Sequence, residues 1–357
     1  MASRPSRAVR GATINVHSTR FALPEWQADG DWLDAQGDLD GVVAPVRTGV
    51  TVEKPRTIIS RNTSPDVPFD RSINAYRGCE HGCIYCFARP THAFLDLSPG
   101  IDFETKLFAK PDAATLLRGE LAKRSYRVSP IAMGTNTDPY QPIERDWRIT
   151  RACVEVLAET RHPLTITTKS DRVVRDADLL ADMAADELVS VMISITSLDS
   201  RVAMTLEPRA AAPARRLKAI EALTKAGIPV QVSVSPIIPA ITDGETETIL
   251  KAAADAGAVR ASFIPVRLPW EVAPLFRAWL DEHYPERAGK VMALIQGMRE
   301  GRDNDPRFGE RMRGSGVWVE MMRARVNLAR WRLGLDGDRV VLRCDLFRPP
   351  SDQGSLF

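Results

Sequence analysis

The sequence is poor in the features that mark secreted, membrane-spanning and strongly charged proteins. Its five cysteines are odd in number and mostly clustered, which argues against a framework of disulfides. No run approaches the roughly 18 apolar residues of a transmembrane helix, and the first twenty residues hold four arginines without an apolar segment. The net charge of +2 provides no global field for a nucleic acid. We therefore expect a cytoplasmic protein with reduced thiols, no membrane span and no secretory signal.

An alternation of short apolar runs and helical patterns begins near residue 72. The chain has 357 residues, 44% of them hydrophobic, which is enough for a large core. Strands separated by helices of this length predict parallel βαβ units, and runs that are apolar nearly throughout predict a sheet covered on both faces. Six units favour a barrel or partial barrel over an open sheet. The predicted strands are 72–76, 130–135, 164–168, 188–196, 228–238 and 259–268, and the predicted helices between them are 111–125, 148–160, 176–186, 212–227 and 245–257.

Three of the five cysteines, Cys79, Cys83 and Cys86, follow the first predicted strand with the spacing C-x3-C-x2-C. In an α/β barrel this end of the strands carries the active site. A structural zinc would need a fourth ligand, which His81 or His92 could supply. Electron-transfer iron–sulfur clusters are closed by four cysteines, whereas three cysteines leave one iron of a four-iron cube open for a substrate or cofactor. The sequence favours the open cluster over zinc and over three incidental cysteines.

The cysteine loop, with Tyr85 directly before its last cysteine, resembles the signature loop of the radical S-adenosylmethionine (radical SAM) superfamily. The segments 134–144, 168–180 and 206–220 resemble the branch that includes spore photoproduct lyase, and 55–335 is similar to an uncharacterised proteobacterial subgroup of it. The resemblance implies an α/β fold with a partial (β/α)6 TIM-type barrel, a [4Fe-4S] cluster and S-adenosylmethionine. It also implies an external one-electron donor, whose electron cleaves the S–C5′ bond to give a 5′-deoxyadenosyl radical that abstracts a substrate hydrogen.

This fold divides the chain into four parts. Residues 1–68 form a partly irregular N-terminal extension, and 69–268 form the barrel. Residues 269–348 form a mainly helical, arginine-rich region, with helices expected at 273–282 and 287–299. Residues 349–357 form a flexible tail.

The same resemblance assigns roles to residues at the carboxyl ends of the strands. The three cysteines would be the iron ligands, and Tyr85 would lie near the adenine and take a catalytic part. A cation after the third strand suits the carboxylate of S-adenosylmethionine, and acceptors after the second strand suit its ammonium group. The candidate cofactor-binding residues are Tyr85, Thr137, Asp138, Lys169, Ser194, Thr196, Glu207 and Arg209.

Each candidate also has a structural interpretation. Tyr85 would pack in the core, Asp138 would form the turn before Pro139, and Glu207 and Arg209 would form a local ion pair. The hydroxyls of the fourth strand would bond the backbone. Glu80, the one carboxylate within the cysteine loop, is expected to face solvent.

Two departures separate the sequence from spore photoproduct lyase. That enzyme uses a cysteine after its second strand as a hydrogen donor, and tyrosines on both sides of its last cluster cysteine. The corresponding stretch 131–138 has no cysteine, and Phe87 follows Cys86. The resemblance therefore extends to the cofactor chemistry and not to the lyase reaction itself.

Two features suggest a nucleic-acid substrate, with damaged or modified DNA as the candidate. The stretch 299–332 holds nine arginines against five acids and includes Trp318, although a solvated helix surface would look the same. The tail resembles the peptide by which bacterial repair proteins bind the DNA sliding clamp, through Gln353, Leu356 and Phe357. Three alternatives stay open: a radical SAM maturase or modifier of a protein or small molecule, an iron–sulfur electron carrier, and a zinc-stabilised nucleic-acid-binding module.

Overall fold

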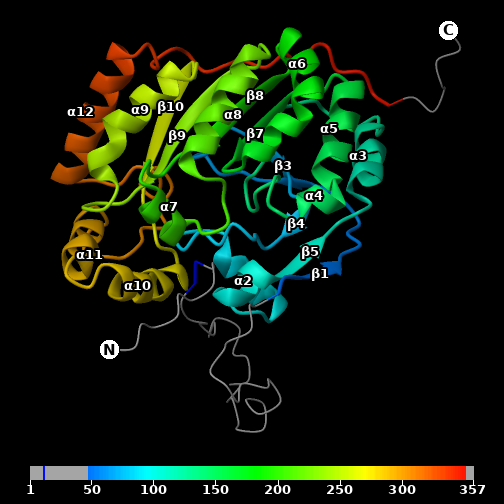
Figure 1. Cartoon of the computed structure of the whole chain (residues 1–357). Coiled ribbons are helices and arrows are strands. Elements are labelled where there is room, and N and C mark those ends of the chain that lie inside the picture. The colour runs from blue at the N-terminus through cyan, green and yellow to red at the C-terminus, as the bar shows by residue number, and fades with distance from the viewer. Residues whose placement is uncertain (1–10, 13–46, 351–357) are drawn as a thin grey trace, which may run out of the picture.

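The computed structural model describes residues 11–12 and 47–350, and its centre is a curved sheet of seven strands (Figure 1). The spatial order is β10-β9-β8-β7-β6-β3-β2, so that the described strands do not close into a ring. Strands β3 to β10 of this sheet run parallel, and β2 is antiparallel to β3 at the edge. The bounds are β2 Ile59–Arg61, β3 Arg71–Ile73, β6 Ile131–Met133, β7 Leu164–Thr168, β8 Val189–Ser194, β9 Val230–Ile237 and β10 Arg260–Pro265.

Helices fill the connections between the parallel strands and cover the outer face of the sheet (Figure 1). The main hydrophobic core lies between these two layers, where Ile131, Ile166, Val191 and Val232 are buried. The six predicted strand–helix units and the partial barrel are confirmed. The helices are α3 Ala113–Leu121, α4 Glu144–Trp147, α5 Ile149–Glu159, η2 Asp171–Asp176, α6 Ala177–Ala185, α7 Ser200–Leu206, α8 Pro213–Lys225, η3 Asp243–Glu245 and α9 Thr246–Asp255.

The inner face of the sheet is polar, although the nearly continuous apolar runs of the strands predict a sheet covered on both faces. On β8, Val189, Val191 and Ile193 belong to the outer core. The residues between them face the other way, since Ser190 accepts a hydrogen bond of 3.0 Å from the Gln231 side chain of β9. Ser233 of β9 continues this polar row with a bond of 2.9 Å to Ser235. The interior of the partial barrel therefore offers hydroxyl and amide groups instead of a second apolar core.

Two strands lie in the segment that the sequence analysis treats as an irregular extension. Strand β2 extends the main sheet, and β1 (Gly49–Val52) pairs with β5 (Lys106–Ala109) in a small second sheet. The third strand of that sheet is β4 (Tyr76–Arg77), directly before the cysteine loop. The short helices η1 (Arg89–Leu95) and α2 (Ile101–Thr105) follow the loop. The boundaries at 68, 268 and 348 stay predictions.

The C-terminal region is mainly helical, as expected, with α10 (Val272–His283), α11 (Ala288–Gly297) and α12 (Val317–Arg332). Helix α12 packs beside α9. Trp318 is partly buried against the core and lies 3.3 Å from an Asp243 carboxylate oxygen, so it is not the open stacking platform that its sequence context suggested. None of the described helices is long and apolar enough to cross a membrane.

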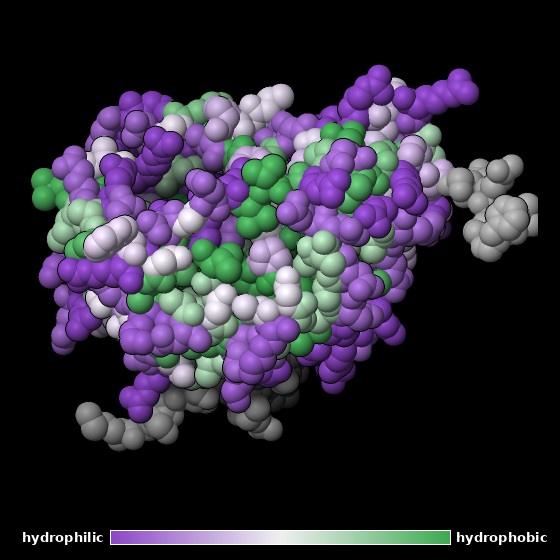
Figure 2. Space-filling view, turned by 90° about the horizontal axis from the view of Figure 1, so that it is seen from above, coloured by the Kyte–Doolittle hydropathy of each residue, from purple (hydrophilic) through white to green (hydrophobic). Residues whose placement is uncertain are grey.

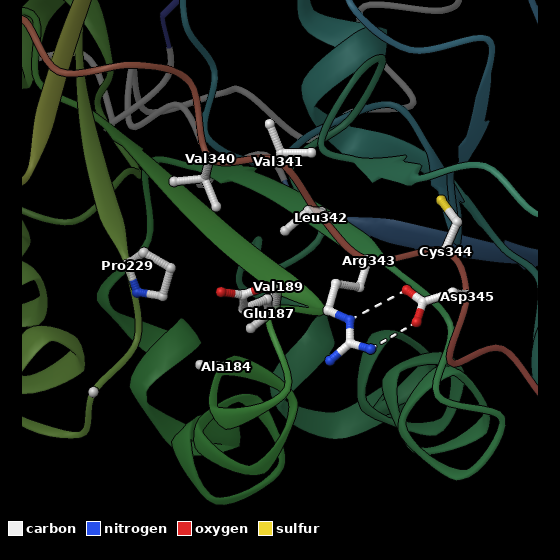
Figure 3. Close-up of a pocket in the computed structure, with 11 residues that line it drawn as sticks. Ala184, Glu187, Val189, Pro229, Val340, Val341, Leu342, Arg343, Cys344 and Asp345 are labelled. Carbon is white, nitrogen blue, oxygen red and sulfur yellow. Dashed lines mark hydrogen bonds and ion pairs between the residues drawn. The ribbon is translucent and has the colours of Figure 1, made fainter.

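The segment after α12 crosses the amino-terminal ends of the strands, along the top of the view in Figure 1. Its backbone amides at Arg343 and Arg348 donate hydrogen bonds to the carbonyls of Glu187 (3.0 Å) and Thr160 (2.9 Å). Seen from above, apolar residues gather in the middle of this face within a hydrophilic surround (Figure 2). A hollow of about 800 Å³ opens here between the segment and the strand ends, with the Arg343–Asp345 ion pair at its rim (Figure 3). It lies at the end opposite the cysteine loop.

Candidate active site

The cysteine loop lies at the carboxyl end of β3, on the side of the barrel that faces down in Figure 1. Cys79 and Cys83 are buried and Cys86 is partly exposed, and all three thiols are free. Cys86 packs against the apolar cluster that contains Cys83 and against the one that contains Cys79. Burial raises the pKa of the Cys79 thiol, and Cys83 and Cys86 lie close enough to raise it further. Backbone bonds from the Cys79 amide to Phe103 (2.9 Å) and from the Ile84 amide to Leu206 (3.0 Å) fix its two ends.

A buried arginine holds the middle of the loop. Arg89 has no exposed surface and donates hydrogen bonds to the carbonyls of Cys83 (2.8 Å), Gly82 (3.0 Å) and Gly100 (2.9 Å). It also forms an ion pair of 2.6 Å with Glu104, which is equally buried. The Glu104 carboxylate in turn accepts the amides of residues 11 and 12, at 3.1 and 2.8 Å. Residues 11 and 12 are thus fastened beside the cysteine loop through Glu104.

A buried amide holds the start of the loop. The Gln141 side chain, which follows β6, accepts the Glu80 amide at 2.9 Å and donates to the Gly78 carbonyl at 3.3 Å. Gly78 has a φ of 73°, and a Cβ there would lie 2.8 Å from the Phe103 carbonyl oxygen, so a side chain does not fit. The peptide groups on both sides of Cys79 are therefore set by one side chain from the neighbouring strand.

Glu80 does not face solvent, contrary to expectation. It is 3% exposed and accepts a hydrogen bond of 2.6 Å from Thr48. It also forms an ion pair of 3.0 Å with Arg209, whose side chain is about one-third exposed. The expected local pair of Glu207 with Arg209 is wrong, because Arg209 neutralises the carboxylate of the cysteine loop and Glu207 finds another partner.

That partner is Arg216, at the first turn of α8. Glu207 and Arg216 form a buried ion pair, and Tyr85 donates to the same carboxylate. Thr196 also donates to Glu207 at 2.7 Å, and its oxygen lies 3.2 Å from the Tyr85 hydroxyl. Burial alone would raise the pKa of Glu207, but Arg216 and then Lys169 lower it to about 2. Tyr85 is held neutral, because burial and the charge of Glu207 raise its pKa.

Lys169 extends from the end of β7 towards this group. Its ammonium nitrogen lies 5.8 Å from the centre of the Tyr85 ring, and its charge lowers the pKa of both Glu207 and Cys83. Among the described residues, no acceptor forms a hydrogen bond with this ammonium group. The site therefore contains a cation without a fixed partner beside the cysteine loop, which suits an anionic ligand group.

The Asp138 carboxylate is occupied by partners within the chain and is not available to an ammonium group of a ligand. Its carboxylate accepts the Thr168 hydroxyl and the Lys169 amide, both at 2.7 Å, and it lies 3.4 Å from His81. Burial would raise the pKa of Asp138, but His81 and these donors lower it to about 2. Asp138 thus ties the ends of β6 and β7 together and sets the backbone of Lys169.

The remaining two candidates are buried near these networks. Thr137 accepts a hydrogen bond of 2.9 Å from the Gln141 side chain. Ser194 is 3% exposed at the end of β8, and its carbonyl accepts a bond of 2.9 Å from Arg216. Hydrogen bonds thus connect Tyr85, Thr196 and Glu207 directly. Arg209 does not belong to this network, because it pairs with Glu80 of the cysteine loop.

Sequence reasoning missed Arg89, Glu104 and Arg216. Arg216 could have been found, because it precedes Ile220 and Leu223 at the helical spacing of the buried face of α8, and a charge there demands a buried partner. Nothing in the local pattern of Arg89 and Glu104 distinguishes them from surface residues.

The side chains of the loop fit an iron–sulfur cube better than a single metal ion. Among the described residues, no three His, Cys, Asp or Glu side chains converge on a single metal ion. A four-iron cube does not need such convergence, because each cysteine binds a different iron. His92, a candidate fourth zinc ligand, instead bonds the Lys106 carbonyl at 2.9 Å. Burial raises the pKa of Cys79 and Cys83, so metal binding would displace their protons.

The chain is similar to known proteins over most of its length. The model of the radical SAM superfamily matches residues 73–253, which contain the cysteine loop and four of the six parallel strands, β6 to β9. An uncharacterised protein of Mycobacterium tuberculosis is 36% identical over 286 residues, which are 79% of this chain and 83% of that protein. An uncharacterised protein of Methanocaldococcus jannaschii is 28% identical over 219 residues, covering 60% and 76% of the two chains.

Two solved structures of spore photoproduct lyase share the fold. One is the enzyme complexed with dinucleoside spore photoproduct, and the other is a variant with bound S-adenosylmethionine and the same photoproduct. Each is 16% identical, covers 80% of this chain and 79% of its own, and gives a TM-score of 0.54. Radical SAM enzymes use a [4Fe-4S] cluster and S-adenosylmethionine. The chain belongs to the radical SAM superfamily and is an enzyme with these two cofactors.

Proposed function

We propose that Cys79, Cys83 and Cys86 ligate the [4Fe-4S] cluster and that the enzyme abstracts hydrogen from a nucleic acid, with damaged or modified DNA as the substrate class. The observation that carries the first part is the set of three free thiols on one loop, held in place by Arg89 and Gln141. When bound, the cluster and S-adenosylmethionine supply a 5′-deoxyadenosyl radical and methionine, after one electron from an external donor has broken the S–C5′ bond.

The chain's own residues position these groups. Lys169 binds the carboxylate of S-adenosylmethionine, since its ammonium group has no acceptor among the described residues and lies beside Tyr85. Tyr85 borders the adenine, with its hydroxyl fixed by Thr196 and Glu207. Ser194, Thr196 and Thr137 offer hydroxyls to the ribose or the amino acid part, and Asp138 acts through the backbone of Lys169. Glu207 and Arg216 act as positioning residues for Tyr85 and not as ligands.

The proposed substrate class is supported by the neighbouring fold and by the inner face of the barrel. Spore photoproduct lyase was solved in a complex with dinucleoside spore photoproduct. The inner face carries hydroxyl and amide side chains such as Ser190, Gln231 and Ser233, which suit a sugar or a base. The free state of all five cysteines supports a cytoplasmic location.

Anaerobic reconstitution tests the cofactor part. A brown protein with four irons that forms 5′-deoxyadenosine from S-adenosylmethionine and a reductant supports the proposal. An iron–sulfur protein that leaves S-adenosylmethionine intact would instead be an electron carrier, and a colourless protein with one zinc would be a binding module. Anaerobic purification followed by analysis of bound nucleic acid tests the substrate class.

Replacement of Lys169 by alanine is expected to raise the dissociation constant of S-adenosylmethionine roughly ten- to a hundredfold. A charge-assisted hydrogen bond to a partly desolvated carboxylate is worth about 1.5–3 kcal/mol. Calorimetric titration of the reconstituted protein measures the change, and the iron content is expected to stay that of the wild type. Lys225, exposed on α8 and paired with Glu221, provides the matched control. Equal affinities for Lys169→Ala and Lys225→Ala would contradict the role of Lys169.

Removal of residues 353–357 is expected to abolish binding to the DNA sliding clamp. Gln353, Leu356 and Phe357 lie outside the described residues, and the proposal depends on their sequence pattern alone. The chain before them is anchored, since Phe347 packs against His162 at a ring distance of 5.3 Å, so the melting temperature is expected to stay unchanged. A titration with purified clamp measures binding. A large fall in melting temperature would show that Phe357 packs in the core, and no binding by the intact chain at about 100 μM would contradict the docking role.

A further inference from the structure

Two pairs of an arginine and a phenylalanine lie at the carboxyl end of the barrel and take no part in the network around Tyr85. Arg267 follows β10, and its guanidinium carbon lies 4.7 Å from the centre of the Phe87 ring. Phe87 directly follows Cys86 and is 46% exposed. In the second pair, Arg311 lies 4.5 Å from the centre of the Phe308 ring, which is 60% exposed. We call these four residues the rim surface.

The two pairs belong to one surface. Arg299, which is buried, bonds the Val266 carbonyl at 3.2 Å and the Glu310 carbonyl at 3.0 Å, so it fastens the segment of Arg267 to that of Arg311. Asp66 acts electrostatically on both Arg267 and Arg311. The surface borders the cysteine loop directly, through Phe87.

The surface carries a surplus of positive charge. Arg311 is paired with Asp66 at 2.5 Å, but Arg267 forms no ion pair or hydrogen bond within the described part of the chain. Burial, together with the charges of Arg311 and Arg299, lowers the pKa of Arg267 to about 10. Arg267 and Arg311 thus share the Asp66 carboxylate, whereas Asp305 and Glu310 act on Arg299. A half-buried arginine in this situation gains from an external anion.

The geometry points to a binding site for a single strand of nucleic acid, in which Arg267 contacts a phosphate and Phe87 and Phe308 stack on bases next to the cysteine loop. A single strand offers phosphates and unstacked bases together, and exposed aromatic rings beside guanidinium groups are the features that bind both. Base pairs in a duplex present no free face to such rings. This inference rests on the proposed nucleic-acid substrate and names the part of the enzyme that holds it.

The test uses the anaerobically reconstituted enzyme and fluorescent single strands of DNA and of RNA, with duplex DNA as a third probe. Binding is followed by fluorescence anisotropy between 50 and 200 mM salt. Arg267→Gln is expected to weaken single-strand binding about tenfold and to reduce the slope of log K against log salt by about 0.7, the value for one phosphate contact. Phe87→Leu is expected to weaken binding about fivefold or more without changing the slope, since stacking releases no counterions.

Two variants serve as controls. Arg343→Gln removes an arginine at the opposite end of the barrel, where it pairs with Asp345, and is expected to leave both affinity and slope unchanged. Arg267→Lys keeps the positive charge and loses the planar guanidinium group. We expect this variant to bind the single strand more weakly than the wild type but with the wild-type salt slope. This result tests the role of the charge even if Arg267→Gln retains less iron. Iron content and formation of 5′-deoxyadenosine are measured for each variant.

The outcomes separate the rim surface from the proposed function. If the wild type binds single strands and Arg267→Gln binds them as tightly as Arg343→Gln does, the rim surface is not the binding site, but the proposal of a nucleic-acid substrate is unaffected. Equal affinity for duplex and single strands would overturn the stacking of bases on Phe87. If the wild type forms 5′-deoxyadenosine but binds no strand, both the rim surface and the nucleic-acid substrate are wrong, and only the cofactor chemistry remains.

Discussion

Replacement of Cys83 by alanine is expected to abolish the formation of 5′-deoxyadenosine, and the same result is expected for Cys79 and Cys86. The loop supplies three thiols, and the other two cysteines lie elsewhere, Cys153 within α5 and Cys344 in the segment that crosses the opposite end of the barrel. Loss of one ligand therefore leaves an iron that no other cysteine can reach. The measurement is chromatographic detection of 5′-deoxyadenosine after anaerobic reconstitution with a chemical reductant.

Cys153→Ala and Cys344→Ala are the matched controls. Each removes one thiol from the same chain, and both are expected to keep the iron content and the cleavage activity of the wild type. Cys153 is fully buried in the core, so its replacement is expected to affect stability and not the cluster. Wild-type iron content and cleavage in Cys83→Ala would show that the ligand assignment is wrong.

The strands and helices of the barrel could be predicted because their signals are local. An apolar run such as 228–238 bounded by helical patterns is sufficient to indicate a buried parallel strand, and β9 is found there. Strands β1 and β2 were not predicted, because they are only four and three residues long and mostly exposed. Their positions depend on pairing with β5 and β3, which no local pattern encodes.

The polar inner face of the barrel is encoded in the sequence as an alternation of serine with apolar residues, which the apolar majority of each strand concealed. Strand β8 has the sequence VSVMIS, in which Ser190 and Ser194 alternate with valine and isoleucine. The apolar majority of such strands suggested two covered faces. The alternation corresponds to one apolar face and one polar face, and the serines of the polar face are buried.

The cysteine loop could be predicted from the sequence, but the charge pairing around it could not. Glu207 and Arg209 are two residues apart, and proximity in the chain suggested an ion pair. The chain turns between α7 and α8 so that Glu207 meets Arg216 at the buried face of α8, while Arg209 meets Glu80. The choice of partner is made by the packing of α8 on β8, which brings together groups from separate elements.

The buried ion pair between Arg89 and Glu104 is expected to stabilise both the fold and the cysteine loop. Replacement of Arg89 by methionine is expected to lower the free energy of unfolding by about 3–5 kcal/mol, because it removes one member of a fully buried ion pair. It also removes the donor to the carbonyls of Gly82 and Cys83, so a lower iron content after reconstitution is expected as well. Urea unfolding of the metal-free protein measures the first effect without a contribution from cluster binding.

The control for this prediction is Arg118→Met. Arg118 and Glu159 form an ion pair of 2.5 Å, close to the 2.6 Å of the buried pair, but their side chains are 44% and 54% exposed. An exposed pair contributes only about 0–1 kcal/mol, so the two variants differ in burial and not in the length of the contact. The double variant Arg89→Met/Glu104→Gln is expected to lose less than the sum of the two single losses, since the remaining buried group no longer carries a charge. Equal losses for Arg89→Met and Arg118→Met, or strict additivity in the double variant, would show that the cysteine loop is held by its backbone contacts and not by this ion pair.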